Sequence, residues 1–103
     1  MARLRADDLD RLAPLLTELR GVDGLRERSP ATFTRGSAAF LHFHSLADGL
    51  VADLKVGDGW RRYAADRPAE RRVVLRDVRR VLRGDTARLA GRPTLPGGTG
   101  TLG

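Results

Sequence analysis

The stretch SAAFLHFHSLADGLVADLKVGDGWRRYA (37–64) decides the fold. Much of it alternates between apolar and other residues with a period of two, which is typical of β-strands. The turn signal Gly57-Asp58-Gly59 separates two of these runs, and short links between consecutive strands favour antiparallel pairing. We therefore predict a four-stranded antiparallel meander. Its expected strands are 31–36, 37–44, 50–56 and 60–64.

A helix is predicted on each side of this sheet region. Near the N-terminus, leucines recur at helical spacing, which places a helix within 8–20, although Pro14 leaves its start open. After Pro68, valines and leucines gather on one side of a predicted helix that Gly84 ends or interrupts. Two such helices can cover one face of the sheet. The expected fold is an α+β two-layer sandwich of order α-β-β-β-β-α.

This fold forms a single domain over 1–90. The remaining segment, GRPTLPGGTGTLG (91–103), is rich in glycine, proline and threonine and is predicted to be a disordered tail.

Strand alternation separates a core face from an open face. In the stretch FLHFH (40–44), Leu41 and Phe43 point one way and both histidines of the chain point the other way. In 50–56 the even-numbered positions are apolar and are expected to meet the helices. The open face is therefore expected to carry Phe40, His42, His44, Asp53 and Lys55.

The histidine pair has three interpretations. With Asp53 or Asp48 it would make a two-histidine, one-carboxylate metal site. With Asp53 it would instead make a base and its orienting carboxylate, but no motif supplies a nucleophile. The plain alternative is a polar sheet surface exposed to water. From the sequence alone we assign no catalytic residue, metal or cofactor, and take His42, His44, Asp53 and Lys55 as a candidate ligand-binding set.

Positive charge is concentrated in the second part of the chain. Through Asp58 there are eight basic and nine acidic residues, whereas from Gly59 onward there are eleven basic and four acidic residues. Much of this charge forms an arginine stripe on the predicted C-terminal helix, a candidate nucleic-acid-binding surface. The stripe consists of Arg72, Arg76, Arg79, Arg80 and Arg83. An acidic protein partner or a merely solvated helix face are the alternatives.

The composition of the chain bears on the cellular location of the protein. The chain has no cysteine, which fits a reducing cytoplasm, and no apolar run long enough to span a membrane.

The string WRRY (60–63) interleaves aromatic and basic residues, a pattern that can stack on nucleic-acid bases but more often packs in a sheet. Strand 60–64 is expected at an exposed edge, where a homodimer could form.

The layout of AFLHFH, a turn, GLVADLKV and a closing helix, over 21–82, resembles small single-domain proteins of high-GC bacteria. It is also similar to the MmcQ/YjbR-like proteins, whose fold is related to frataxin. That resemblance implies helices at both ends on one face of an antiparallel sheet, and a loose association with DNA binding. We predict a non-enzymatic binding module that uses the open sheet face or the basic helix. The alternatives are DNA binding through the arginine stripe and an enzyme centred on His42 and His44.

Overall fold

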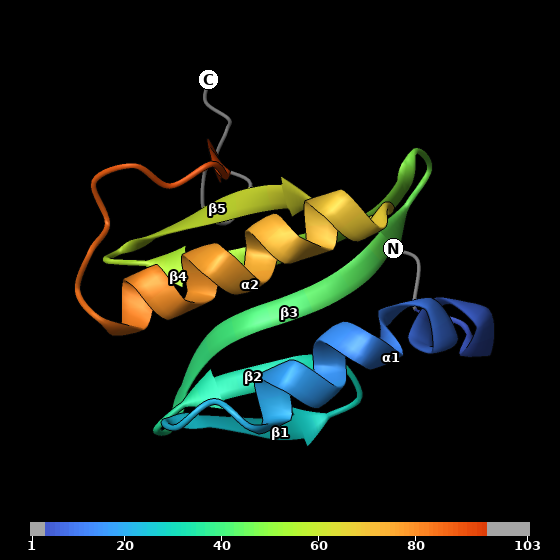
Figure 1. Ribbon diagram of the computed structural model, residues 1–103, viewed down its shortest axis with the longest axis horizontal. Coiled ribbons are helices and arrows are strands. Elements are labelled where there is room, and N and C mark those ends of the chain that lie inside the picture. Colours follow the sequence, from blue (N-terminus) through green and yellow to red (C-terminus); the bar gives the residue numbers. More distant parts are fainter. Residues whose placement is uncertain (1–3, 95–103) are drawn as a thin grey trace.

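The computed structural model describes residues 4–94 and confirms an α+β fold with an antiparallel sheet (Figure 1). Two helices, α1 (Ala6–Arg20) and α2 (Pro68–Leu82), accompany six strands that pair in chain order. The strands are β1 (Leu25–Ser29), β2 (Thr32–Arg35), β3 (Ala38–Leu46), β4 (Gly49–Val56), β5 (Gly59–Ala64) and β6 (Arg92–Thr94). No helix in this part of the chain has the length and apolar character needed to cross a membrane.

The sheet has six strands, so the expected number of four is wrong. β1 has the sequence LRERS, with little β-propensity, and forms by antiparallel pairing with β2. β6 falls within the predicted tail and pairs with β5, while 95–103 lie outside the described residues. Because Pro93 lacks an amide hydrogen, it fits an edge strand. β5 is therefore internal, and the expected exposed edge at 60–64 is wrong.

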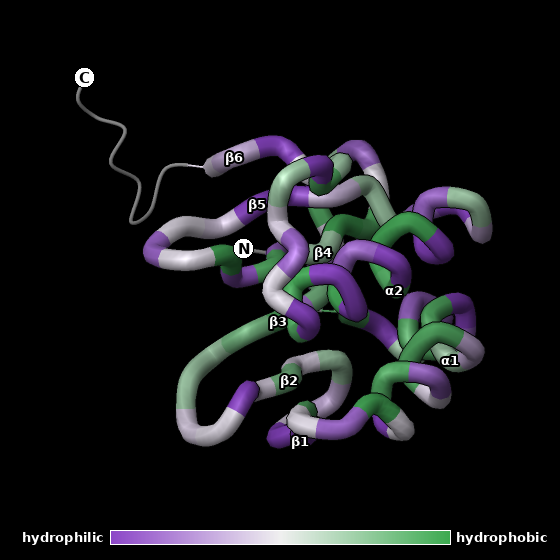
Figure 2. The backbone as a smooth tube through the Cα atoms, turned by 60° about the vertical axis from the view of Figure 1, so that its left-hand side comes forward, coloured by the Kyte–Doolittle hydropathy of each residue, from purple (hydrophilic) through white to green (hydrophobic). Residues whose placement is uncertain are grey.

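Both helices lie on the same side of the sheet, as Figures 1 and 2 show. α1 contacts β1, whereas α2 contacts β4 and β5, and the helices also contact each other. α1 continues through Pro14 and starts at Ala6, where the Arg5 amide donates a 2.9 Å hydrogen bond to the Asp8 carboxylate. α2 ends at Leu82, just before Gly84. Within residues 4–94, no helix covers the other face of the sheet.

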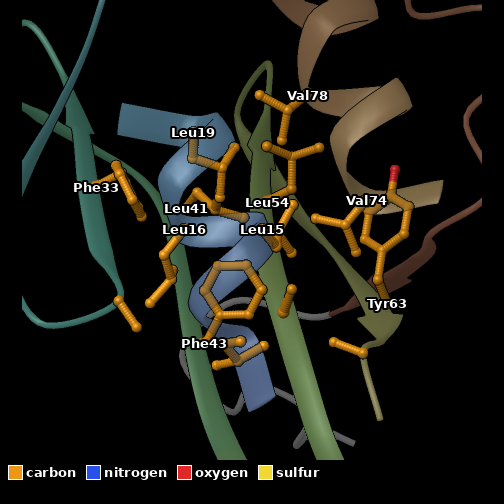
Figure 3. Packing of buried hydrophobic residues seen from close by; sticks show 14 of the residues in the cluster. Leu15, Leu16, Leu19, Phe33, Leu41, Phe43, Leu54, Tyr63, Val74 and Val78 are labelled. Carbon is orange, nitrogen blue, oxygen red and sulfur yellow. The ribbon is translucent and has the colours of Figure 1, made fainter. Parts of the chain in front are cut away.

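The hydrophobic core fills the space between the helices and the sheet (Figure 3). Leu41 and Leu54 are direct cross-strand partners, fully buried beneath the helices, and Phe43 pairs with Ala52. The strand alternation predicted for these positions is therefore correct. The helices supply Leu12, Leu15, Leu16, Leu19, Val74, Val78 and Val81 to the same core.

Phe40 departs from the expected alternation. The β2–β3 register passes from Phe33 opposite Leu41 to Thr34 opposite Ala39, so Phe40 is an extra residue in β3. Such a bulge interrupts the alternation of side chains along the strand. Phe40 is buried in the hydrophobic cluster, and the Arg35 guanidinium lies over its ring, 5.9 Å from the centroid. It is thus not an exposed binding residue.

A buried carboxylate ties α2 to the last strands. Asp77 is fully buried and accepts hydrogen bonds of 2.7 Å from the Tyr63 hydroxyl and from the Ala90 amide. Arg61 donates a 2.9 Å hydrogen bond to the Gly91 carbonyl. Because buried polar groups are costly unless they are paired, these bonds fix the path of the chain into β6.

Candidate functional site

The open face of the sheet brings three functional side chains into one row across β3, β4 and β5. His42 is the direct partner of Asp53, and Asp53 is the direct partner of Arg62. His44 lies two residues beyond His42 and therefore shares its face. Two-residue turns at 47–48 and 57–58 set this register, since the pairs flanking them are Leu46 with Gly49 and Val56 with Gly59.

Asp53 is the centre of this row. Arg62 donates two parallel hydrogen bonds, from Nε to Oδ1 and from Nη2 to Oδ2, each 2.9 Å long. His44 Nε2 lies 2.8 Å from Oδ2. The Asp53 side chain is only 9% exposed, so these contacts replace the water that an isolated carboxylate would require.

Asp53 and Arg62 are both charged at neutral pH. Burial raises the pKa of Asp53, but the hydrogen bonds and charges of Arg62 and His44 outweigh it and hold the pKa below its ordinary value. The Asp53 carboxylate likewise raises the pKa of Arg62. Asp53 is therefore an anion with a fixed orientation, and its charge is compensated by Arg62.

His42 lies between two other rings. The centroid of the His42 ring is 5.1 Å from that of the His44 ring and 5.3 Å from that of the Trp60 ring. The His42 and Trp60 rings form a T-shaped pair. Burial lowers the pKa of His42, and the charges of His44 and Arg62 act in the same direction against the opposing effect of Asp53. His42 is consequently a neutral imidazole at pH 7.

Trp60 lies on the open face together with Lys55, its cross-strand partner. The Lys55 ammonium is 5.3 Å from the centre of the Trp60 ring, a cation–π contact. Trp60 and Arg62 are half-buried, whereas Tyr63 is buried on the helix side. The split of WRRY between the two faces therefore follows strand alternation, and Trp60 is the member available to a ligand.

Arg92 extends the row to the edge of the sheet. It is the direct partner of Arg62 and is exposed. Sequence reasoning missed it because RPT gives no strand signal within a glycine- and proline-rich segment. Arg62 could have been found, because the turn Gly57-Asp58 already implies the pairing of Asp53 with Arg62.

The arginine stripe lies on α2, on the helix-covered side of the sheet. Three of its members contact groups of this chain. Arg76 Nε is 2.9 Å from Asp77 Oδ1, Arg80 lies 3.8 Å from the same oxygen, and Arg79 is 3.4 Å from Glu18. Arg72 and Arg83 are exposed and have no carboxylate partner within 4–94.

Three of the four expected ligand residues, His42, His44 and Asp53, therefore form one cluster, while Lys55 lies beside Trp60. The histidine and aspartate donor atoms lie within 4.8 Å of one another. Comparison with protein-family models, curated proteins and solved structures finds no match.

Proposed function

We propose that this protein is a non-enzymatic binding module whose open sheet face binds single-stranded nucleic acid. The binding surface, called here the aromatic-basic face, consists of Lys55, Trp60, Arg62 and Arg92. The observation that carries the proposal is the position of Trp60, which is half-buried, pairs directly with Lys55 on β4, and lies two residues before Arg62, the partner of Arg92 on β6.

The charge of this face favours an anionic ligand. Strands β4, β5 and β6 contain one carboxylate, Asp53, and Arg62 compensates it. Lys55 and Arg92 are then available for phosphates, on opposite sides of Trp60. Each phosphate contact would release a condensed counterion and make the affinity depend on salt.

The aromatic residue favours single strands over duplexes. Unpaired bases can stack on a tryptophan ring, whereas the bases of a duplex are already stacked on one another. Stacking on an aromatic side chain contributes about 1–3 kcal/mol per base. Lys55 has a flexible stem, so it can move from the Trp60 ring to an adjacent phosphate when a base arrives.

The arginine stripe is the weaker candidate surface. Arg76 and Arg80 approach Asp77, and Arg79 approaches Glu18, so a phosphate would compete with carboxylates already in place. On the aromatic-basic face Lys55 and Arg92 face no such competitor among the described residues. The absence of cysteine fits a cytoplasmic location for this activity.

The test is fluorescence anisotropy of a labelled oligothymidine or oligouridine titrated with the full chain at several salt concentrations. We expect the logarithm of the affinity to fall against the logarithm of salt concentration with a slope of about −1.4 to −2, as two or three phosphate contacts predict. The double substitution Lys55→Ala/Arg92→Ala should weaken binding at least about tenfold.

The matched control removes two arginines from the helix side. Arg72→Ala/Arg83→Ala changes the net charge by the same amount but leaves the aromatic-basic face intact, so it should change the affinity less than about threefold. If the two double variants lose the same affinity, only the net charge matters and the proposal fails. Binding to a duplex as tight as binding to the single strand would also contradict it.

A further inference from the structure

We propose that His42, His44 and Asp53 form a binding site for a divalent transition-metal ion of the Zn²⁺ type. This inference goes beyond nucleic-acid binding and does not rest on it, because it uses different side chains of the open face. The observation behind it is convergence: one donor atom from each of the three residues lies within 4.8 Å of the other two.

The distances suit a first-row metal ion. Imidazole nitrogens bind Zn²⁺ at about 2.0–2.1 Å and carboxylate oxygens at about 2.0–2.2 Å, so ligands in a tetrahedral site lie about 3.4 Å apart. His44 Nε2 and Asp53 Oδ2 are 2.8 Å apart, and the His42 and His44 ring centroids are 5.1 Å apart. Side-chain rotations that move these atoms by about 1 Å would complete the three-ligand set.

The backbone beneath the site is rigid. Two of the ligands share strand β3 and the third lies on β4, where Asp53 is the direct partner of His42. β3 also pairs with β2, and β4 also pairs with β5. The ligands therefore lie on internal strands and not on loops. Ligands on such elements are held more reproducibly than ligands on loops.

Arg62 has a defined role in this arrangement. Its Nε holds Asp53 Oδ1, which lets Oδ2 turn to the metal while the carboxylate keeps its orientation. The metal must displace the contacts that His44 and Arg62 Nη2 make with Oδ2. Because Arg62 also repels a cation, we expect a dissociation constant on the order of 1–10 µM.

The ligand types select the metal. Imidazole nitrogen favours Zn²⁺, Ni²⁺ and Cu²⁺, whereas Mg²⁺ and Ca²⁺ require a set of oxygen ligands. His42 and His44 are half-buried with their sheet face uncovered by a helix, so water can complete the coordination of the bound ion. A site with three protein ligands and bound water differs from a closed structural zinc site.

The experiment is calorimetric titration of the full chain with ZnCl₂, with MgCl₂ as the comparison. We expect one Zn²⁺ per chain, no Mg²⁺ binding, and at least a tenfold loss of Zn²⁺ affinity in His42→Ala and in Asp53→Asn. The matched control is Asp48→Asn, which removes an exposed carboxylate in the β3–β4 turn and should keep the affinity within about twofold.

The inference is overturned if no heat appears up to about 100 µM Zn²⁺, or if His42→Ala binds as tightly as the unsubstituted chain. If a variant fails to fold, NMR of the unsubstituted protein tests the metal site instead. The chain has two histidines, so both imidazole signals must shift on addition of one equivalent of Zn²⁺, and unshifted signals reject the site. None of these readouts requires nucleic acid, so this site and the proposed function can fail separately.

Discussion

Arg62 and Asp53 face each other on neighbouring strands and share two parallel hydrogen bonds of 2.9 Å. The pair joins β4 to β5 on the open face and keeps one carboxylate ionised in a place with little access to water. Because Arg62 compensates Asp53, Lys55 and Arg92 have no carboxylate partner among residues 4–94. Arg62 belongs to the proposed nucleic-acid surface, and Asp53 is a ligand of the proposed metal site.

Removing the guanidinium should destabilise the domain. In Arg62→Ala the partly exposed guanidinium is lost and the buried Asp53 carboxylate keeps His44 as its remaining side-chain partner within 4–94, so we expect the free energy of unfolding to fall by about 1–2 kcal/mol. Urea denaturation measures this change. The neutral control is Arg26→Ala, because Arg26 is exposed. Arg61→Ala is unsuitable, because Arg61 donates a hydrogen bond to the Gly91 carbonyl. A stability loss equal to that of Arg26→Ala would show that the pair contributes nothing.

Asp77 should be among the most sensitive positions of the chain. In Asp77→Ala the Tyr63 hydroxyl and the Ala90 amide lose their acceptor inside the protein, which should cost about 2–4 kcal/mol. Asp85→Ala removes an exposed carboxylate just beyond α2 and should change stability by less than about 0.5 kcal/mol. Thermal or urea unfolding compares the two variants, and similar losses for both would refute the structural role of Asp77.

The same carboxylate predicts a pH dependence. Burial raises the pKa of Asp77, but hydrogen bonds from the Ala90 amide, Tyr63 and Arg76 outweigh burial and lower it overall. A group whose pKa is lower in the folded state stabilises the fold above its unfolded pKa of about 3.9, and this contribution disappears as the pH falls through the folded value. The stability difference between the unsubstituted chain and Asp77→Asn should therefore shrink below about pH 4. A difference that stays constant from pH 7 to pH 3 would contradict this.

Gly91 should not tolerate a side chain. A Cβ atom built there overlaps the Tyr63 ring, whose hydroxyl is held by Asp77 and which cannot move aside without breaking that bond. We expect Gly91→Ala to lower the free energy of unfolding by about 1–3 kcal/mol. Gly59→Ala is the control, because a Cβ atom there meets open space at a φ that suits alanine. Equal stability of the two variants would show that β6 is not docked as described.

Much of the open face could be predicted from alternation alone. A period of two places His42, His44 and Asp53 on one side of the sheet whatever the length of the neighbouring strands. Two-residue turns set the register, so the Asp53–Arg62 pair was also within reach of the sequence. Each of these features depends on local spacing.

The features that were missed depend on contacts distant in sequence. β1 and β6 have little intrinsic β-propensity and form because neighbouring strands offer unpaired edges, so Arg92 was assigned to a tail. Phe40 was placed on the open face because a bulge leaves no local signal. Asp77 is next to Arg76 in the sequence, but the burial of Asp77 and the contact of Arg79 with Glu18 on α1 arise only in the folded chain, so the arginine stripe looked free.

Trp60 provides the most direct test of the proposed function, because it is the only tryptophan in the chain and lies at the centre of the aromatic-basic face. Its fluorescence is recorded while an unlabelled oligothymidine is added at low salt. We predict saturable quenching whose midpoint matches the anisotropy measurement, and at least a fivefold loss of affinity in Trp60→Leu, as loss of one stacked base implies. Unchanged Trp60 fluorescence at oligonucleotide concentrations that saturate the anisotropy signal would place the ligand elsewhere and contradict the account.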